Sequence, residues 1–135
     1  MSRFNATLDK NNRMCMPYKF RCRFDGSFVI AKNLAKDVQC LQIYTLNQWR
    51  EFKENTRTKL STQNASELLR FMRAEEINID TEGRFLIPQQ LRTYAKLQDS
   101  VIIIDLGEHL EIWNEEDLEK VMSMPCDFLD LLENA

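Results

Sequence analysis

One nine-residue pattern occurs twice in the chain, and this repetition limits the folds that the chain can adopt. Residues 9–17 read DKNNRMCMP and residues 80–88 read DTEGRFLIP, so a shift of 71 positions aligns Asp with Asp, Arg with Arg and Pro with Pro. In both copies apolar residues flank a short polar stretch, which is typical of two strands joined by a tight turn. The pattern therefore predicts two turns of the same design.

The residue before each arginine supports this prediction. Asn12 and Gly83 occupy the same position in the two copies. These two residue types tolerate a positive φ angle better than any others, and tight turns select them for this reason. We therefore expect the chain to turn in the same way in both places.

A second matching block lies further along each half. Residues 41–45, LQIYT, match residues 110–114, LEIWN, at a shift of 69 positions. Each block alternates apolar and polar residues as a strand does, and ends at a residue, Thr45 or Asn114, that is suited to cap a helix. Gln48 completes a capping box with Thr45. Each half thus reads strand, turn, strand-like run, short helical turn, two further strands and helix.

The duplication predicts one β core. A four-strand half of about 60 residues buries too little apolar surface to be stable alone, so the two copies should interleave. Two copies also fall short of the three that a solenoid needs. We expect a β-rich α+β fold with pseudo-two-fold symmetry and one globular unit. Residues 1–60 would form the first repeat, residues 61–75 a connecting helix, and residues 76–135 the second repeat with an acidic amphipathic C-terminal segment.

The two halves carry opposite charge. Residues 1–73 contain 14 Lys and Arg against 6 Asp and Glu, while residues 74–135 contain 4 against 15. The net charges are therefore +8 and −11. Such a split indicates an anionic partner, such as nucleic acid, at the basic half, and it is equally compatible with self-association of basic on acidic surfaces.

Other features limit the class of protein. The longest apolar run, residues 101–104, is far shorter than the roughly 20 residues that a membrane span requires, and no signal peptide is apparent. We therefore expect a soluble, cytoplasmic protein. The cysteines form no C-x-x-C pair and share the chain with a single histidine, so neither a metal site nor another cofactor is expected. These residues are Cys15, Cys22, Cys40, Cys126 and His109.

The first turn carries the side chains best suited to contact DNA. Arg13 offers a guanidinium fork that matches the O6 and N7 atoms of guanine. Asn11 and Asn12 offer amide groups for adenine, and Lys10 offers an ammonium for phosphate. Arg3 lies in the same basic N-terminal segment and joins the candidate DNA-binding residues.

The aspartates and the second turn are expected to be structural. Asp9 could pair with Arg13, and Asp80 with Arg84, and such local ion pairs would simply hold the turns. The second turn also carries Glu82 and lies in the acidic half. For Arg13 a purely structural role stays open. We nevertheless interpret the first turn as the reader, which contacts the bases of DNA, and the second as a scaffold, which only supports the fold.

These motifs resemble those of the MraZ family of bacteria. The resemblance rests on the repeated Asp-x-x-x-Arg with its apolar run and proline, and on three further motifs. Those are Phe-x-Ala-Thr-Leu-Asp at residues 4–9, LQIY at residues 41–44 and LEIWNEE at residues 110–116. The first turn of the family usually reads Asp-x-Lys-Gly-Arg, whereas this chain has its lysine one place earlier and Asn12 in place of the glycine.

The resemblance implies a double AbrB-like, swapped-hairpin β barrel with peripheral helices, assembled into a ring-shaped homo-oligomer. It also implies sequence-specific binding of double-stranded DNA at short direct repeats, regulation of the division and cell-wall gene cluster, and association with the nucleoid. It implies no small-molecule substrate, cofactor or membrane partner. Asp9, Arg13, Asp80 and Arg84 match the motif of the family directly.

Two other classes of function stay open. An enzyme could use the paired Asp and Arg residues, although no glycine-rich phosphate loop or nucleophile motif accompanies them. A protein-interaction or assembly module would form the ring without binding nucleic acid.

Two apolar features remain. Trp49 and Trp113 fall in the apolar pattern of their elements, so both are expected to anchor the core. The acidic C-terminal stretch has an apolar side, formed by residues 128–129 and 131–132, that is expected to dock on the core or on a neighbouring subunit.

Overall fold

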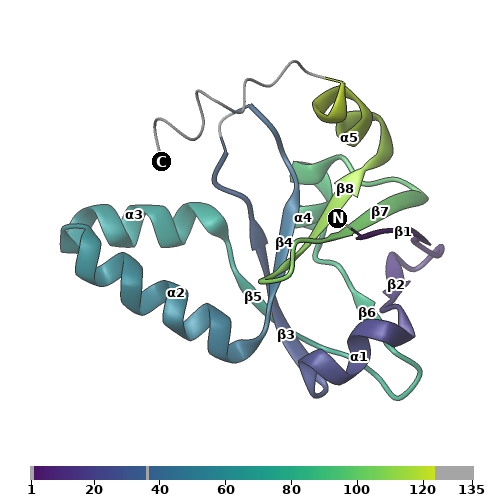
Figure 1. Cartoon of the computed structure of the whole chain (residues 1–135), viewed down its shortest axis with the longest axis horizontal. Coiled ribbons are helices and arrows are strands. Elements are labelled where there is room, and N and C mark those ends of the chain that lie inside the picture. The colour runs from purple at the N-terminus through teal and green to yellow at the C-terminus, as the bar shows by residue number, and fades with distance from the viewer. Residues whose placement is uncertain (1, 36, 124–135) are drawn as a thin grey trace.

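The computed structural model describes residues 2–35 and 37–123, and its elements follow the same order in the two halves (Figure 1). The first half contains β1 (Ser2–Thr7), β2 (Arg13–Cys15), α1 (Tyr18–Phe24), β3 (Ser27–Lys32), β4 (Leu41–Tyr44) and α2 (Leu46–Lys59). After the connecting helix α3 (Thr62–Met72), the second half contains β5 (Glu75–Asn78), β6 (Arg84–Leu86), α4 (Gln89–Ala95), β7 (Ser100–Asp105), β8 (Leu110–Asn114) and α5 (Glu115–Met122).

The first strand of each half pairs with a strand of the other half. Six strands form one antiparallel sheet in the order β1-β7-β8-β4-β3-β5, so β1 pairs with β7 and β5 pairs with β3. β4 and β8 pair at the centre, and the short strands β2 and β6 form a separate two-stranded ribbon. This exchange confirms the predicted β-rich α+β fold with interleaved, pseudo-two-fold halves, and the described strands form a sheet with β1 and β5 at its edges plus a ribbon, not a closed barrel.

The exchange joins the apolar faces of both halves in one core. The register sets Phe4 opposite Ile103 and Ile77 opposite Phe28. The rings of Phe28 and Phe85, which belong to different halves, meet edge to face with their centroids 4.9 Å apart, an arrangement that aromatic pairs prefer. Because each half contributes only part of this core, the two copies must fold together.

Thr45 and Asn114 cap the N-termini of α2 and α5, as predicted. The Thr45 hydroxyl accepts a hydrogen bond from the Gln48 backbone N–H at 3.0 Å, and the Gln48 side chain accepts one from the Thr45 N–H at 2.9 Å. The Asn114 side chain accepts a hydrogen bond from the Asp117 N–H at 3.1 Å. These bonds satisfy backbone donors that a helix N-terminus leaves without partners.

The two tryptophans differ in burial. Trp113 is 4% exposed and belongs to the core, as predicted. Trp49 is only partly buried, and its ring stacks on that of Phe52 with the centroids 5.3 Å apart. The prediction of a core anchor at Trp49 is therefore wrong. The physical reason is that α2 and α3 extend away from the sheet as a helical hairpin (Figure 1), and Trp49, in the first turn of α2, packs on Phe52 of the same helix and on Tyr44 at the end of β4.

The remaining expectations concern the connecting helix, membrane spans and the C-terminal segment. α3 lies within the predicted connecting segment 61–75, and no helix of residues 2–35 and 37–123 is long and apolar enough to cross a bilayer. The apolar C-terminal residues expected to dock on the core or on a neighbour lie outside the described residues.

Candidate functional site

The first turn is held by its aspartate. Asp9 Oδ1 accepts hydrogen bonds from the backbone N–H groups of Asn11 at 2.8 Å and Arg13 at 3.0 Å. The Asp9 carbonyl oxygen accepts another from the Asn12 N–H at 2.9 Å. Asn12 has a φ of 62°, a left-handed conformation that asparagine tolerates. Asp9 thus holds the turn through backbone N–H groups, where the sequence suggested an ion pair with the arginine side chain.

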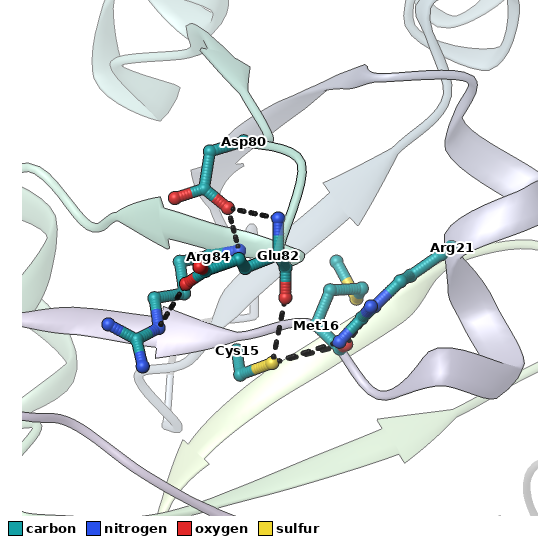
Figure 2. A network of polar contacts seen from close by, with 6 residues as sticks. All are labelled: Cys15, Met16, Arg21, Asp80, Glu82 and Arg84. Carbon is teal, nitrogen blue, oxygen red and sulfur yellow. Dashed lines mark hydrogen bonds and ion pairs between the residues drawn. The ribbon is translucent and has the colours of Figure 1, made fainter.

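The second turn has the same internal design. Asp80 Oδ1 accepts hydrogen bonds from the backbone N–H groups of Glu82 at 2.9 Å and Arg84 at 2.8 Å, as Figure 2 shows. The Asp80 carbonyl oxygen accepts a hydrogen bond from the Gly83 N–H at 3.0 Å. Gly83 has a φ of 84°, which corresponds to the left-handed Asn12 of the first turn.

These bonds favour the ionised form of both aspartates. The hydrogen bond from the Arg13 backbone N–H is the main cause that lowers the pKa of Asp9, and the Arg84 N–H lowers the pKa of Asp80 in the same way. A smaller effect crosses between the turns: the positive charge of Arg84 also lowers the pKa of Asp9, and that of Arg13 lowers the pKa of Asp80. The two turns therefore lie within electrostatic reach of each other.

The arginines of the two turns meet on the β2–β6 ribbon. Arg13 lies opposite Leu86, and Cys15 lies opposite Arg84. Successive side chains point to opposite sides of a strand, so these four residues share one side of the ribbon. All four are exposed, while the residues between them are buried. The candidate site is thus one exposed surface to which both halves of the chain contribute.

Arg21 of α1 crosses to the second turn. Its Nε donates a hydrogen bond to the Met16 carbonyl oxygen at 3.0 Å, and its Nη2 donates one to Cys15 Sγ at 3.1 Å (Figure 2). The guanidinium also covers Gly83, because a Cβ atom added there would lie 2.4 Å from Arg21 Cζ. Glycine suits this position because of its positive φ, and a larger residue would have to displace the Arg21 guanidinium.

The second half contains the counterpart of Arg21. Arg92 of α4 donates a hydrogen bond from Nε to the Ile87 carbonyl oxygen at 2.8 Å. Arg21 and Arg92 each stand four residues after the proline of their copy. The expectations from the sequence do not include this pair, although the repeated Pro-x-x-x-Arg spacing was a signal that could have identified it.

The two turns differ in what their arginine side chains contact. Arg84 Nε lies 3.7 Å from Glu82 Oε2, and both side chains are exposed. Over residues 2–35 and 37–123, no ion pair or side-chain hydrogen bond involves the Arg13 guanidinium. The exposed tip beside it carries Lys10 and Asn11. The first turn therefore presents unpaired positive charge, whereas the second turn largely neutralises its own.

An acidic hollow of about 580 Å³ lies beside the first turn. Its lining includes Asn12 of the turn together with Asp99, Glu115 and Glu116. Carboxylates repel an anionic partner. Such a partner would therefore meet the first turn from the ribbon side and not from the side of the hollow.

Two other basic residues of the first half pair with acidic residues of the second in the described part of the chain. Arg3, a candidate site residue, lies in β1, and its Nη2 is 2.9 Å from Glu119 Oε1 on α5. Arg23 forms two hydrogen bonds with the Asp105 carboxylate, at 3.3 and 3.2 Å, and these are the main cause that lowers the pKa of Asp105. Ion pairs within one chain thus neutralise part of the opposite charge of the two halves. Among the described residues of the β2–β6 ribbon, Arg13 is the cation without an ion-pair partner.

The chemistry available at this surface is that of hydrogen-bond donors and positive charge on a rigid turn. The part of the chain that the structure describes contains no group of three or more His, Cys, Asp or Glu side chains placed to hold a metal ion.

Comparisons with known proteins point to one family. A family model described as "MraZ protein, putative antitoxin-like" matches the chain twice, at residues 1–71 and 70–125. A protein of Clostridium tetani named Transcriptional regulator MraZ is 34% identical over 133 residues, which cover 96% of this chain and 92% of that protein. Proteins of the same name from Pediococcus pentosaceus and Caldanaerobacter subterraneus are 33% and 35% identical. Those alignments cover 99% and 89% of this chain, and 94% and 84% of the relatives.

Proposed function

The chain belongs to the MraZ family, and on that premise we propose that it is a sequence-specific DNA-binding regulator of transcription. The observation that carries the proposal is the Arg13 guanidinium, which projects from a rigid turn and has no side-chain partner among the described residues. The names of the relatives, which describe regulators of transcription and not enzymes, agree with this proposal.

The first turn is the reader. Asp9 fixes the backbone of the turn before any partner arrives, and such preorganisation reduces the entropy lost on binding. The planar fork of Arg13 can then bind O6 and N7 of a guanine in the major groove. Asn11 and Asn12 offer amide groups for an adenine, and the exposed Lys10 offers a positive charge for phosphate.

The second turn is the scaffold. Arg84 shares its charge with Glu82, and Asp80 holds only backbone groups. The turn supports the first half directly, because the Met16 backbone N–H donates a hydrogen bond to the Gly83 carbonyl oxygen at 2.7 Å. Arg3 must leave Glu119 to reach a phosphate, so its contribution to DNA affinity is smaller than that of Arg13.

The proposal includes a ring-shaped homo-oligomer that acts at the nucleoid in the cytoplasm. One reader turn per subunit provides only a small interface with DNA, which is too small for tight specific binding. Subunits related by rotation present their turns in the same sense, so a ring would read direct repeats. The proposed target lies near the promoter of the division and cell-wall gene cluster. In each subunit, residues 1–60 and 76–135 are the two repeats and residues 61–75 connect them.

Mobility-shift titrations test the proposal. The probe is the DNA upstream of the chain's own gene, compared with a scrambled duplex of the same composition, at about 50 and about 200 mM salt. The parent protein should prefer the upstream probe, and its affinity should fall steeply with salt. Arg13→Ala should lose ~1–3 kcal/mol per engaged subunit. Arg57→Ala, which removes the same charge from an exposed position on α2, is the matched control and should bind as the parent does.

Each component of the proposal can fail separately. If Arg13→Ala and Arg57→Ala bind equally well, Arg13 is structural. If the parent protein binds both probes alike, it is not sequence-specific. A ring with no affinity for either probe would instead indicate an assembly module.

A further inference from the structure

An apolar side chain lies between the two arginines of the ribbon. Leu86 is 47% exposed and is the register partner of Arg13. It also follows Arg84 by two positions on β6, so the two side chains share one side of that strand. Cys15 lies opposite Arg84 and completes the surface. The exposed side of the ribbon thus carries arginine beside leucine in one cross-strand pair and cysteine beside arginine in the next.

A single exposed leucine is ordinary on a protein surface, so the argument depends on where Leu86 lies. Register partners in an antiparallel pair stand about 5 Å apart, and alternate residues of a strand stand about 7 Å apart. Base pairs of B-DNA stack about 3.4 Å apart. Leu86 therefore lies within one or two base pairs of any base that Arg13 contacts.

We propose that the β2–β6 ribbon enters the major groove and that Leu86 contacts the 5-methyl group of a thymine next to the guanine bound by Arg13. This inference rests on the proposed function. The major groove is wide enough for a two-stranded ribbon, and thymine is the base that presents a methyl group there. The occupant is DNA and not an apolar protein surface, because arginines flank Leu86 on both strands and Arg21 lies beside Cys15. The positive charge of Arg13 and Arg21, neither of which has an ion-pair partner among the described residues, complements the phosphate backbone.

The experiment removes only the methyl group. Each thymine of the bound probe is replaced in turn by uracil, which keeps the same hydrogen-bonding groups and lacks the methyl. The parent protein should lose about fourfold in affinity, per repeat engaged, at one thymine beside the essential guanine, as expected for one methyl group taken out of contact. Leu86→Ala should bind the thymine and uracil probes equally. Leu106→Ala, which shortens another exposed leucine, is the matched control and should keep the preference of the parent.

Leu86→Met provides a second variant that retains an apolar side chain of similar size, and it should keep part of the preference for thymine. If the parent protein binds the upstream probe but no uracil replacement weakens binding, the inference is wrong while the proposed function stands. If the parent protein binds no duplex, both are wrong. If Leu86→Ala keeps the thymine preference and changes the mass of the particle in solution, Leu86 is a contact between copies of the chain and the inference is overturned.

Discussion

The Arg21 guanidinium covers Gly83, and the two residues belong to different halves of the chain. A Cβ atom at Gly83 would lie 2.4 Å from Arg21 Cζ, closer than nonbonded atoms approach. Arg21 also donates hydrogen bonds to the Met16 carbonyl oxygen and to Cys15 Sγ. One side chain of α1 therefore connects the strand after the first turn to the tip of the second.

Gly83→Ala is expected to lower the melting temperature. A φ of 84° is strained for an L residue, by roughly 1–2 kcal/mol, and the new methyl group would displace Arg21 from its two acceptors. Thermal unfolding of Gly83→Ala, Arg21→Ala and the double variant measures the contact, and the two changes should cost less together than the sum of their separate costs. If the stability losses of the two single variants add up to that of the double variant, Arg21 and Gly83 do not interact. Asn12→Gly, at the matching position of the first turn, is the control and should not destabilise.

Asp80→Ala and Arg84→Ala are expected to change stability more than DNA affinity. In Asp80→Ala two backbone N–H groups lose their acceptor, and in Arg84→Ala the ion pair with Glu82 is lost. Melting temperature and affinity for the upstream probe should be compared for each variant. A loss of affinity without a change in melting would show that the second turn also reads DNA.

Acid should weaken both turns. The pKa values of Asp9 and Asp80 are lowered in the folded chain, chiefly by backbone N–H groups. Their stabilising effect is therefore fully present above the unfolded-state pKa of about 3.9 and is lost as the pH falls through the lower folded pKa. Asp80→Asn cannot titrate, so the difference in melting temperature between parent and variant should shrink from about pH 6 to about pH 3. If the difference in melting temperature stays constant over this pH range, protonation of Asp80 does not contribute to the loss of stability in acid.

A maleimide should label Cys15 and Cys22 in the folded protein and spare Cys40. The first two are exposed, whereas Cys40 is fully buried. Burial, together with the nearby Glu111 carboxylate, raises the pKa of the Cys40 thiol, and the thiolate is the reactive form. Mass mapping of the labelled peptides with and without denaturant checks this prediction. Rapid labelling of Cys40 without denaturant would show that the sheet opens there.

If the ring reads direct repeats, the spacing of the repeats should matter. Turns that meet one side of the duplex need sites about 10–10.5 bp apart. Because the turns are tethered in one particle, affinity should rise sharply from one repeat to two. Probes with two repeats at this spacing, and with the spacing changed by half a helical turn, should be compared while the particle mass is measured. Tight binding by a monomer, or indifference to spacing, would rule out the ring as the reader.

The turns could be predicted from the sequence because their bonds are local. Asp9 and Asp80 reach only as far as the arginine four residues later, so the repeated pattern contains every partner that the turn needs. The interleaved halves could also be predicted, since one half is too small to bury a core of its own.

Contacts between distant residues could not be predicted in this way. The approach of Arg21 to Gly83 and the pairing of Arg3 with Glu119 depend on which surfaces meet, and one sequence does not contain that information. Trp49 shows a related limit. The apolar periodicity of a helix marks its apolar side, but it does not tell how completely that side is covered, and Trp49 stacks on Phe52 of its own helix and stays partly exposed.

Because both halves belong to one chain, they need not be identical, and the molecule need not be symmetric. Two identical halves, each lending its first strand to the other, would form a symmetric pair with two identical turns, and a pair of that kind suits a palindrome. In a single chain the exchanged strands still form one core, but the turns are free to differ, and Asn12 and Gly83 show that they do. The two ends of the chain's pseudo-two-fold core are therefore unlike, and the proposed DNA reader would distinguish the two orientations of an asymmetric site.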